Sequence, residues 1–208
     1  MEADQLVGAA LVAGMVLFLV GAGAWRPVYD RPLAESLPAV HADRRRRAWI
    51  HTWMIVALLV TPAGLAGFVV LAEPALARAV AGMGAAVYMV GAVCWVVSLA
   101  FRLTVVPWGA ERTVAEGAPP EQFVALDAWA GSLYSVHMLS AYASFVLLGA
   151  AVLVGGNLPA WLGWLGVGWG VAFVAGFVVV ADRFGGAFYP PFWAHAYTGV
   201  LGVVLLAT

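Results

Sequence analysis

Six apolar stretches divide the sequence and limit what it can fold into. A helix needs about 20 predominantly apolar residues to cross a bilayer. Hydrophobic residues make up 64% of the chain and charged residues only 10%, whereas soluble domains carry about 25% charged residues. The sequence therefore predicts an all-α, polytopic membrane protein in which residues 1–208 form a single bundle of six transmembrane helices. The expected helices cover about residues 5–25, 48–72, 75–101, 121–155, 159–181 and 191–207.

Prolines and glycines mark several of the expected helix ends. The Pro119-Pro120 pair suits the start of a helix, whereas Gly155-Gly156 favours a helix end. Three prolines interrupt residues 26–47, so that segment and residues 103–120 are expected to be polar loops. The pair Asp182-Arg183 is expected to end the fifth helix.

Four consecutive arginines, Arg44–Arg47, stand directly before the second apolar stretch and set its orientation. Arginine-rich loops are retained on the cytoplasmic side of a membrane. Nine of the ten basic residues fall in residues 26–47, 102–120 and 182–190, and the tenth is Arg78. We therefore expect these loops to face the cytoplasm and both termini to face outward.

Three histidines are expected at one depth on the cytoplasmic side. His51 lies four residues after Arg47, which is about 6 Å along a helix, and His195 lies at a similar depth after Pro191. His137 lies 18 residues before Gly155, about 27 Å from the outer end of its helix, which brings it near the inner boundary as well. The sequence therefore predicts a cytoplasm-facing pocket of histidine and aromatic side chains. Its further candidate residues are Tyr134, Ser144, Tyr189 and Tyr197.

Two cofactors suit such a pocket. Two histidines on facing helices can supply both axial ligands of a b-type haem. Alternatively, His51, His137 and His195 together could hold a divalent metal ion with an open position for water or substrate. The first functional hypothesis is therefore a b-type haem or metal site for membrane redox chemistry.

Other functions stay open, because the sequence contains no HExxH, CxxC or CxxCH motif. The first alternative is a cofactor-free carrier or membrane enzyme for a small apolar molecule, with histidine handling protons near neutral pH. The second is a structural subunit of a membrane complex. Histidines near the membrane boundary can also sit among lipid headgroups without any further role.

The expected partners follow from composition and from small-residue faces. The net charge of −1 suggests no nucleic-acid partner, and the lipid bilayer of a bacterial or archaeal inner membrane is the expected environment. Small residues recur on two helices, which favours close packing and homo- or hetero-oligomers through glycine and tryptophan faces. These residues are Gly84, Gly91 and Ser98, and Gly163, Gly166 and Gly170. The absence of lysine excludes a retinal Schiff base.

One stretch carries a family resemblance. The residues Gly156-Asn157-Leu158-Pro159-Ala160-Trp161-Leu162-Gly163-Trp164-Leu165-Gly166 resemble the start of the fifth helix in poorly characterised bacterial families of small six-helix membrane proteins. The resemblance covers 11 of the 208 residues. It implies a six-helix fold and assigns no catalytic residue.

Overall fold

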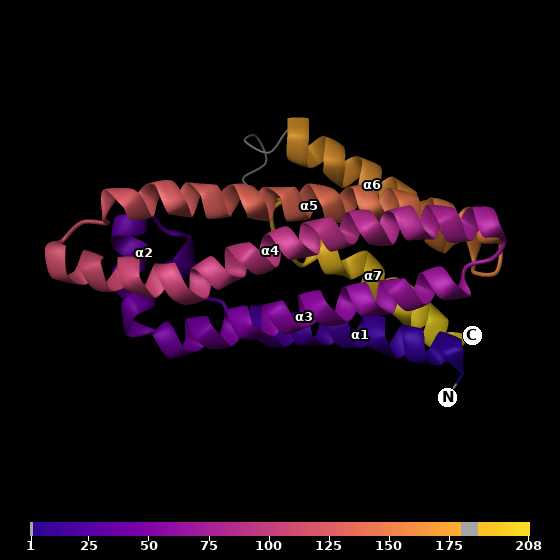
Figure 1. Ribbon diagram of the computed structural model, residues 1–208, viewed down its shortest axis with the longest axis horizontal. Coiled ribbons are helices and arrows are strands. Elements are labelled where there is room, and N and C mark those ends of the chain that lie inside the picture. Colours follow the sequence, from indigo (N-terminus) through magenta and orange to yellow (C-terminus); the bar gives the residue numbers. More distant parts are fainter. Residues whose placement is uncertain (1, 180–186) are drawn as a thin grey trace.

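The computed structural model describes residues 2–179 and 187–208, which form an elongated bundle of helices (Figure 1). The described part of the chain contains no strand. Five of its helices, α1, α3, α4, α5 and α6, are long and apolar enough to cross a membrane, so the chain is a multi-pass helical membrane protein. The elements are α1 (Ala3–Ala22), η1 (Pro27–Asp30), α2 (Leu33–Ala42), α3 (Arg44–Leu71), α4 (Ala75–Glu116), α5 (Glu121–Gly155), α6 (Ala160–Val179) and α7 (Trp193–Ala207).

Most predicted helix boundaries agree with the structure within a few residues. Helix α5 begins at Glu121 directly after Pro120, and Gly156 ends it with a φ of 69°, a left-handed conformation that favours glycine. Helix α7 has 15 residues, fewer than the other apolar helices. The prediction that Asp182-Arg183 ends the fifth helix lies outside the described residues.

The two predicted polar loops were wrong. The segment 26–47 contains the 3-10 helix η1 and the helix α2, and α2 continues through Pro38. The segment 103–120 is largely helical as well, because α4 runs on through Pro107 to Glu116. The predicted start of the second transmembrane helix was four residues late, since all four arginines belong to α3.

Tertiary packing explains these errors. Helix α2 lies against the extension of α4 (Figure 1), and an apolar cluster joins the two to the start of α5. Burial of this cluster offsets the local cost of a proline within each helix. The cluster consists of Leu37, Val40, Phe101, Val106, Ala110, Phe123 and Ala130.

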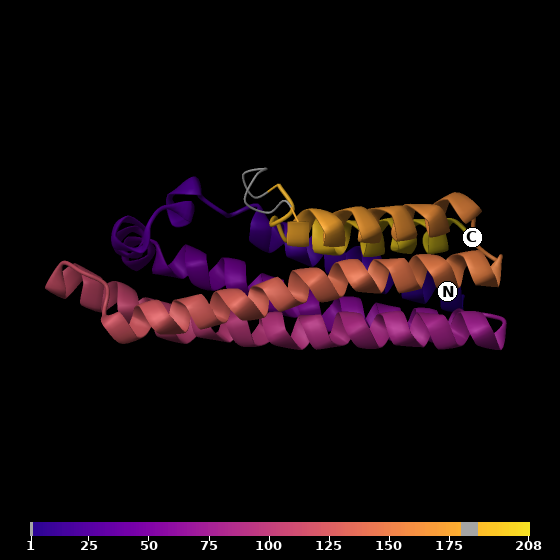
Figure 2. The same ribbon diagram turned by 90° about the horizontal axis from the view of Figure 1, so that it is seen from above.

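Helices α4 and α5 are too long for the membrane alone. Their 42 and 35 residues correspond to roughly 63 Å and 52 Å, against a hydrocarbon core of about 30 Å. Figure 2 shows the α4–α5 hairpin extending well past the other long helices. The extension of the hairpin and α2 lie together at one end of the bundle. The same end contains Arg44–Arg47 at the start of α3.

Small residues bring α4 and α5 close together, as their spacing predicted. A Cβ atom at Gly91 would lie 2.7 Å from Ser140 Cβ and 3.2 Å from the Cα of His137. Seven residues further along α4, which is about two turns, the Ser98 hydroxyl donates to the Ala130 carbonyl at 2.9 Å. The close approach at Gly91 fixes where the His137 side chain meets α4.

Candidate functional site

His137 and His195 form the centre of the candidate site. His137 lies on α5 and His195 on α7, and both are fully buried. Their ring centroids are 6.2 Å apart, and the ring planes are inclined by 41°. Two helices distant in sequence thus bring two imidazoles together in the core of the bundle.

Aromatic side chains enclose this histidine pair. Trp95 stacks on His137 with 4.5 Å between centroids and lies 6.0 Å from His195. Phe18 of α1 stacks on the other imidazole, also at 4.5 Å. Residues from α1, α4, α5 and α7 therefore meet at one point, and the pair is enclosed by rings.

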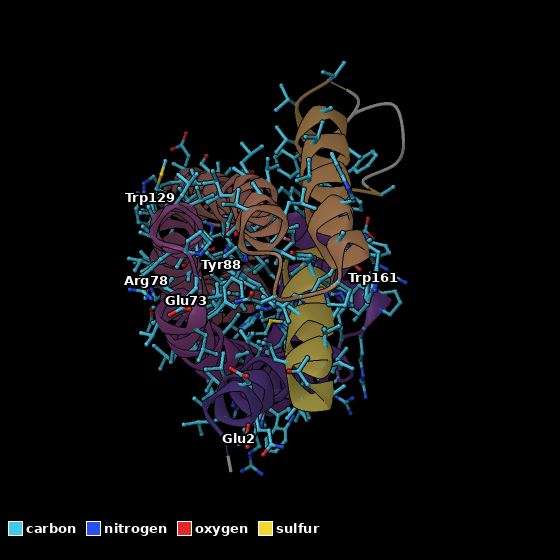
Figure 3. All side chains as sticks on the ribbon, turned by 90° about the vertical axis from the view of Figure 1, so that its right-hand side faces the viewer. Glu2, Glu73, Arg78, Tyr88, Trp129 and Trp161 are labelled. Atoms are coloured by element: carbon cyan, nitrogen blue, oxygen red, sulfur yellow. The ribbon has the colours of Figure 1, made fainter. Side chains whose placement is uncertain are left out.

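Among the described residues, Tyr88 of α4 is the side chain that makes a polar contact to the pair. Figure 3 shows its side chain directed into the space between the helices, whereas Trp161 and Arg78 lie on the rim. Its hydroxyl donates to the Ala194 carbonyl at 3.4 Å and lies 3.2 Å from Nδ1 of His195. In the tautomer of His195 that is protonated at Nδ1, the hydroxyl accepts from Nδ1–H and Nε2 carries the lone pair.

Several buried polar atoms of the bundle, including those of the pair, have no hydrogen-bond partner within residues 2–179 and 187–208. A buried polar group left unpaired costs about 1–3 kcal/mol, and most such groups in folded proteins are paired. A concentration of them inside a membrane bundle therefore marks a candidate site. These atoms are both ring nitrogens of His137, Nε2 of His195, Thr61 Oγ1, Ser144 Oγ and the Tyr197 hydroxyl.

His51 does not join the pair. It is buried on α3, one helical turn beyond Arg47, and its Nδ1 has no hydrogen-bond partner in the described part of the chain. Across those same residues, no cluster of three histidine, cysteine or acidic side chains is arranged to hold a metal. The structure thus brings together two of the three candidate histidines.

The predicted pocket residues fall into two groups. Tyr197 and Ser144 are fully buried, and Tyr197 packs against Phe145 with 5.1 Å between centroids. Tyr134 packs against Trp95 at 5.5 Å and donates its hydroxyl proton to the carbonyl of Tyr189. Tyr189 is 39% exposed as a residue and its ring packs against Phe177, so its contact with the predicted pocket residues is through its backbone carbonyl.

Tyr88, Trp95 and Phe18 were not among the site residues predicted from the sequence. Tyr88 and Trp95 alternate with the small-residue stripe of α4. The spacing is four residues and then three along the series Gly84, Tyr88, Gly91, Trp95 and Ser98, and all five residues are buried. That spacing places them on one helix face, so the signal was present. Nothing in the sequence marked Phe18, whose role depends on α1 lying beside α7.

A second polar cluster lies at the arginine-rich end of the molecule. The Tyr29 hydroxyl donates to Asp43 Oδ2 at 2.5 Å, and the same carboxylate pairs with Arg26 and Arg46 at 3.3 Å and 3.2 Å. Burial and this hydrogen bond raise the pKa of Tyr29 to about 12. The bond from Tyr29, followed by the arginine charges, lowers the pKa of Asp43.

Comparison with known proteins gives one match. A family model described as "Domain of unknown function (DUF4386)" matches residues 6–208. No curated protein and no solved structure matches the chain.

Proposed function

We propose that this chain, which belongs to the DUF4386 family of domains of unknown function, is a membrane redox protein in which His137 and His195 bind one metal centre. The metal is either a single ion or the iron of a b-type haem. The remaining candidate, His51, lies outside this pair and has no ligating role in the proposal.

The proposed topology has six crossings in the cell membrane, with both termini outside. Both chain ends lie at one end of the bundle (Figure 1), as an even number of crossings requires. The five long apolar helices and the shorter α7 supply six segments. The arginine run Arg44–Arg47 lies at the opposite end, which the positive-inside rule assigns to the cytoplasm.

The geometry of the histidine pair is the observation that carries the proposal. Two imidazoles that share a metal through bonds of about 2.0–2.1 Å have ring centres roughly 5–6.5 Å apart. The observed separation between the centroids of His137 and His195 is 6.2 Å. Tyr88 holds the second ring with Nε2 as the free nitrogen, in the way that outer hydrogen bonds orient metal-binding histidines.

A single ion needs less rearrangement than haem. Haem must insert its flat ring between two axial ligands, yet Trp95 is in contact with one imidazole and close to the other. Imidazole nitrogens suit copper, iron, zinc and nickel, and only the first two of these favour redox chemistry in such a site. We therefore rank a copper or iron ion ahead of haem.

The test is a visible spectrum and a metal analysis on the full chain purified in detergent, with His137→Ala and His195→Ala as variants. The matched control is His41→Ala, because His41 lies on α2, away from the pair. About one equivalent of metal that is lost in both variants and kept in the control supports an ion. A Soret band that shifts on reduction and follows the same pattern supports haem.

A cofactor-free carrier or membrane enzyme for a small molecule is the second candidate. The unpartnered hydroxyls of Thr61, Ser144 and Tyr197 favour it, because two-imidazole metal binding does not use them. Protein purified from its native membrane without metal or haem, and unable to bind added copper or iron, would refute the redox proposal. A search for a co-purifying small molecule would then test the carrier.

A further inference from the structure

Among the four consecutive arginines, Arg47 alone is buried. Arg47 is 7% exposed, whereas Arg44 and Arg45 are exposed and Arg46 is half-buried. A topology signal requires only that the charges remain on one side of the membrane. The inward direction of Arg47 therefore calls for another explanation.

The guanidinium of Arg47 lies against two aromatic rings. Its Cζ is 4.4 Å from the ring centroid of Tyr29 and 4.8 Å from that of Trp25. Its Nε and Nη1 have no hydrogen-bond partner among residues 2–179 and 187–208. Cation–π contacts offset part of the cost of burial, but they leave the N–H donors unused.

The residue lines a cavity of about 230 Å³ between α2 on one side and α3, α4 and α5 on the other. Arg102 of α4 also lines it, and Arg102 Nη1 bonds to Asp127 Oδ1 of α5 at 2.6 Å. The charged groups around the cavity are three arginines and two aspartates, an excess of one positive charge. They are Arg31, Arg47 and Arg102, and Asp30 and Asp127.

Within the described residues, none of the nearby carboxylates forms an ion pair with Arg47. Asp127 bonds to Arg102, and both oxygens of Asp30 accept from the indole N–H of Trp25 at 3.2 Å. The carboxylate of Asp43 receives the Tyr29 hydroxyl and pairs with other arginines. Arg47 therefore lines a cavity that carries excess positive charge, and two of its guanidinium nitrogens have no hydrogen-bond partner within the described residues.

We propose that this cavity binds an oxyanion of the phosphate class through Arg47 and Arg102. The planar fork of arginine matches phosphate oxygens, and such charge-assisted bonds are among the strongest in proteins. The source is either free phosphate or the headgroup of an anionic phospholipid, because the cavity is lined by residues of the arginine-rich end, which the proposed topology places at the cytoplasmic headgroups. This site is separate from the histidine pair and does not depend on the redox proposal.

The experiment measures binding to the full chain in detergent with two probes. Inorganic phosphate is titrated calorimetrically against a chloride buffer of equal ionic strength. Phosphatidylglycerol is compared with phosphatidylcholine by native mass spectrometry. We expect Arg47→Gln to weaken binding of the effective probe about tenfold or more, because two or more charged hydrogen bonds are lost.

The matched control is Arg45→Gln, which removes the same charge from an exposed neighbour on the same helix. Binding of phosphate itself assigns a soluble ligand, and binding of phosphatidylglycerol alone assigns the lipid. Equal losses in both variants would mean a diffuse charge effect and overturn the proposal. So would the absence of binding by either probe.

Asp127→Asn keeps the test decisive if Arg47→Gln fails to fold. This change removes one negative charge from the cavity lining and releases Arg102 from its ion pair. We expect the effective probe to bind about two- to tenfold more tightly. Unchanged or weaker binding in this variant would contradict a phosphate site at this cavity.

Discussion

Replacement of Tyr88 by phenylalanine tests how the histidine pair is held. The hydroxyl is the single polar group bonded to either imidazole within the described residues, through Nδ1 of His195 at 3.2 Å. Tyr88→Phe keeps the ring that lies 6.2 Å from His137 and removes only the hydroxyl. We expect two losses, one in stability and one in metal affinity.

The magnitude of each loss follows from the contacts. Both bonds of the hydroxyl are long, at 3.2 Å and 3.4 Å, so their net contribution lies in the lower part of the usual range of about 0.5–1.5 kcal/mol each. The variant also leaves Nδ1–H of His195 buried without an acceptor, so we expect a total loss of stability of about 1–2 kcal/mol. Loss of an outer partner of a metal-binding histidine typically lowers metal affinity about 10–100-fold.

The assays are thermal unfolding of the detergent-purified protein and competition for copper or iron against a coloured chelator. Tyr142→Phe is the matched control, because the Tyr142 hydroxyl donates a hydrogen bond to the Phe188 carbonyl at 2.8 Å, away from the histidines. The control should lose about 0.5–1.5 kcal/mol of stability and bind metal like the wild type. Wild-type metal affinity in Tyr88→Phe would refute the role assigned to Tyr88.

The other predictions concern helix packing and the arginine-rich end. Gly91→Ala should destabilise the protein by about 1–3 kcal/mol, because the new Cβ would lie 2.7 Å from Ser140 Cβ. Gly131→Ala is the control, because no neighbouring atom lies within 4 Å of a Cβ at Gly131, and it should be neutral or stabilise the protein by up to about 1 kcal/mol. Thermal unfolding compares the two variants, and equal effects on stability would contradict the packing of α4 against α5. Tyr29 should ionise at about pH 12 in absorbance titrations, and the stability due to its protonated form should be complete below pH 10 and lost as pH rises through about 12. Asp43→Asn should lower that pKa toward 10, since the carboxylate raises it; an unchanged titration would contradict the Tyr29–Asp43 bond.

Helix existence followed from the sequence because apolar length and small-residue spacing are local properties. The stripe of Gly84, Gly91 and Ser98 packs closely against a helix, as its spacing indicated, and the structure identifies that helix as α5. The extension of α4 through Pro107 could not be predicted in this way, because it depends on the packing of α2 against it. Local proline rules describe an isolated helix and not one whose side is buried.

The candidate site likewise has features that the sequence determines and features that depend on tertiary packing. The sequence by itself determined a helical membrane chain, the arginine-rich end, and three histidines whose depths could be estimated from rise per residue. Only the tertiary structure decided which helices are neighbours, because rotation about each helix axis and the order of packing depend on all side chains together. That arrangement places the His137 ring beside the His195 ring, while His51 lies outside this pair. It also buries the Arg47 side chain in the protein interior.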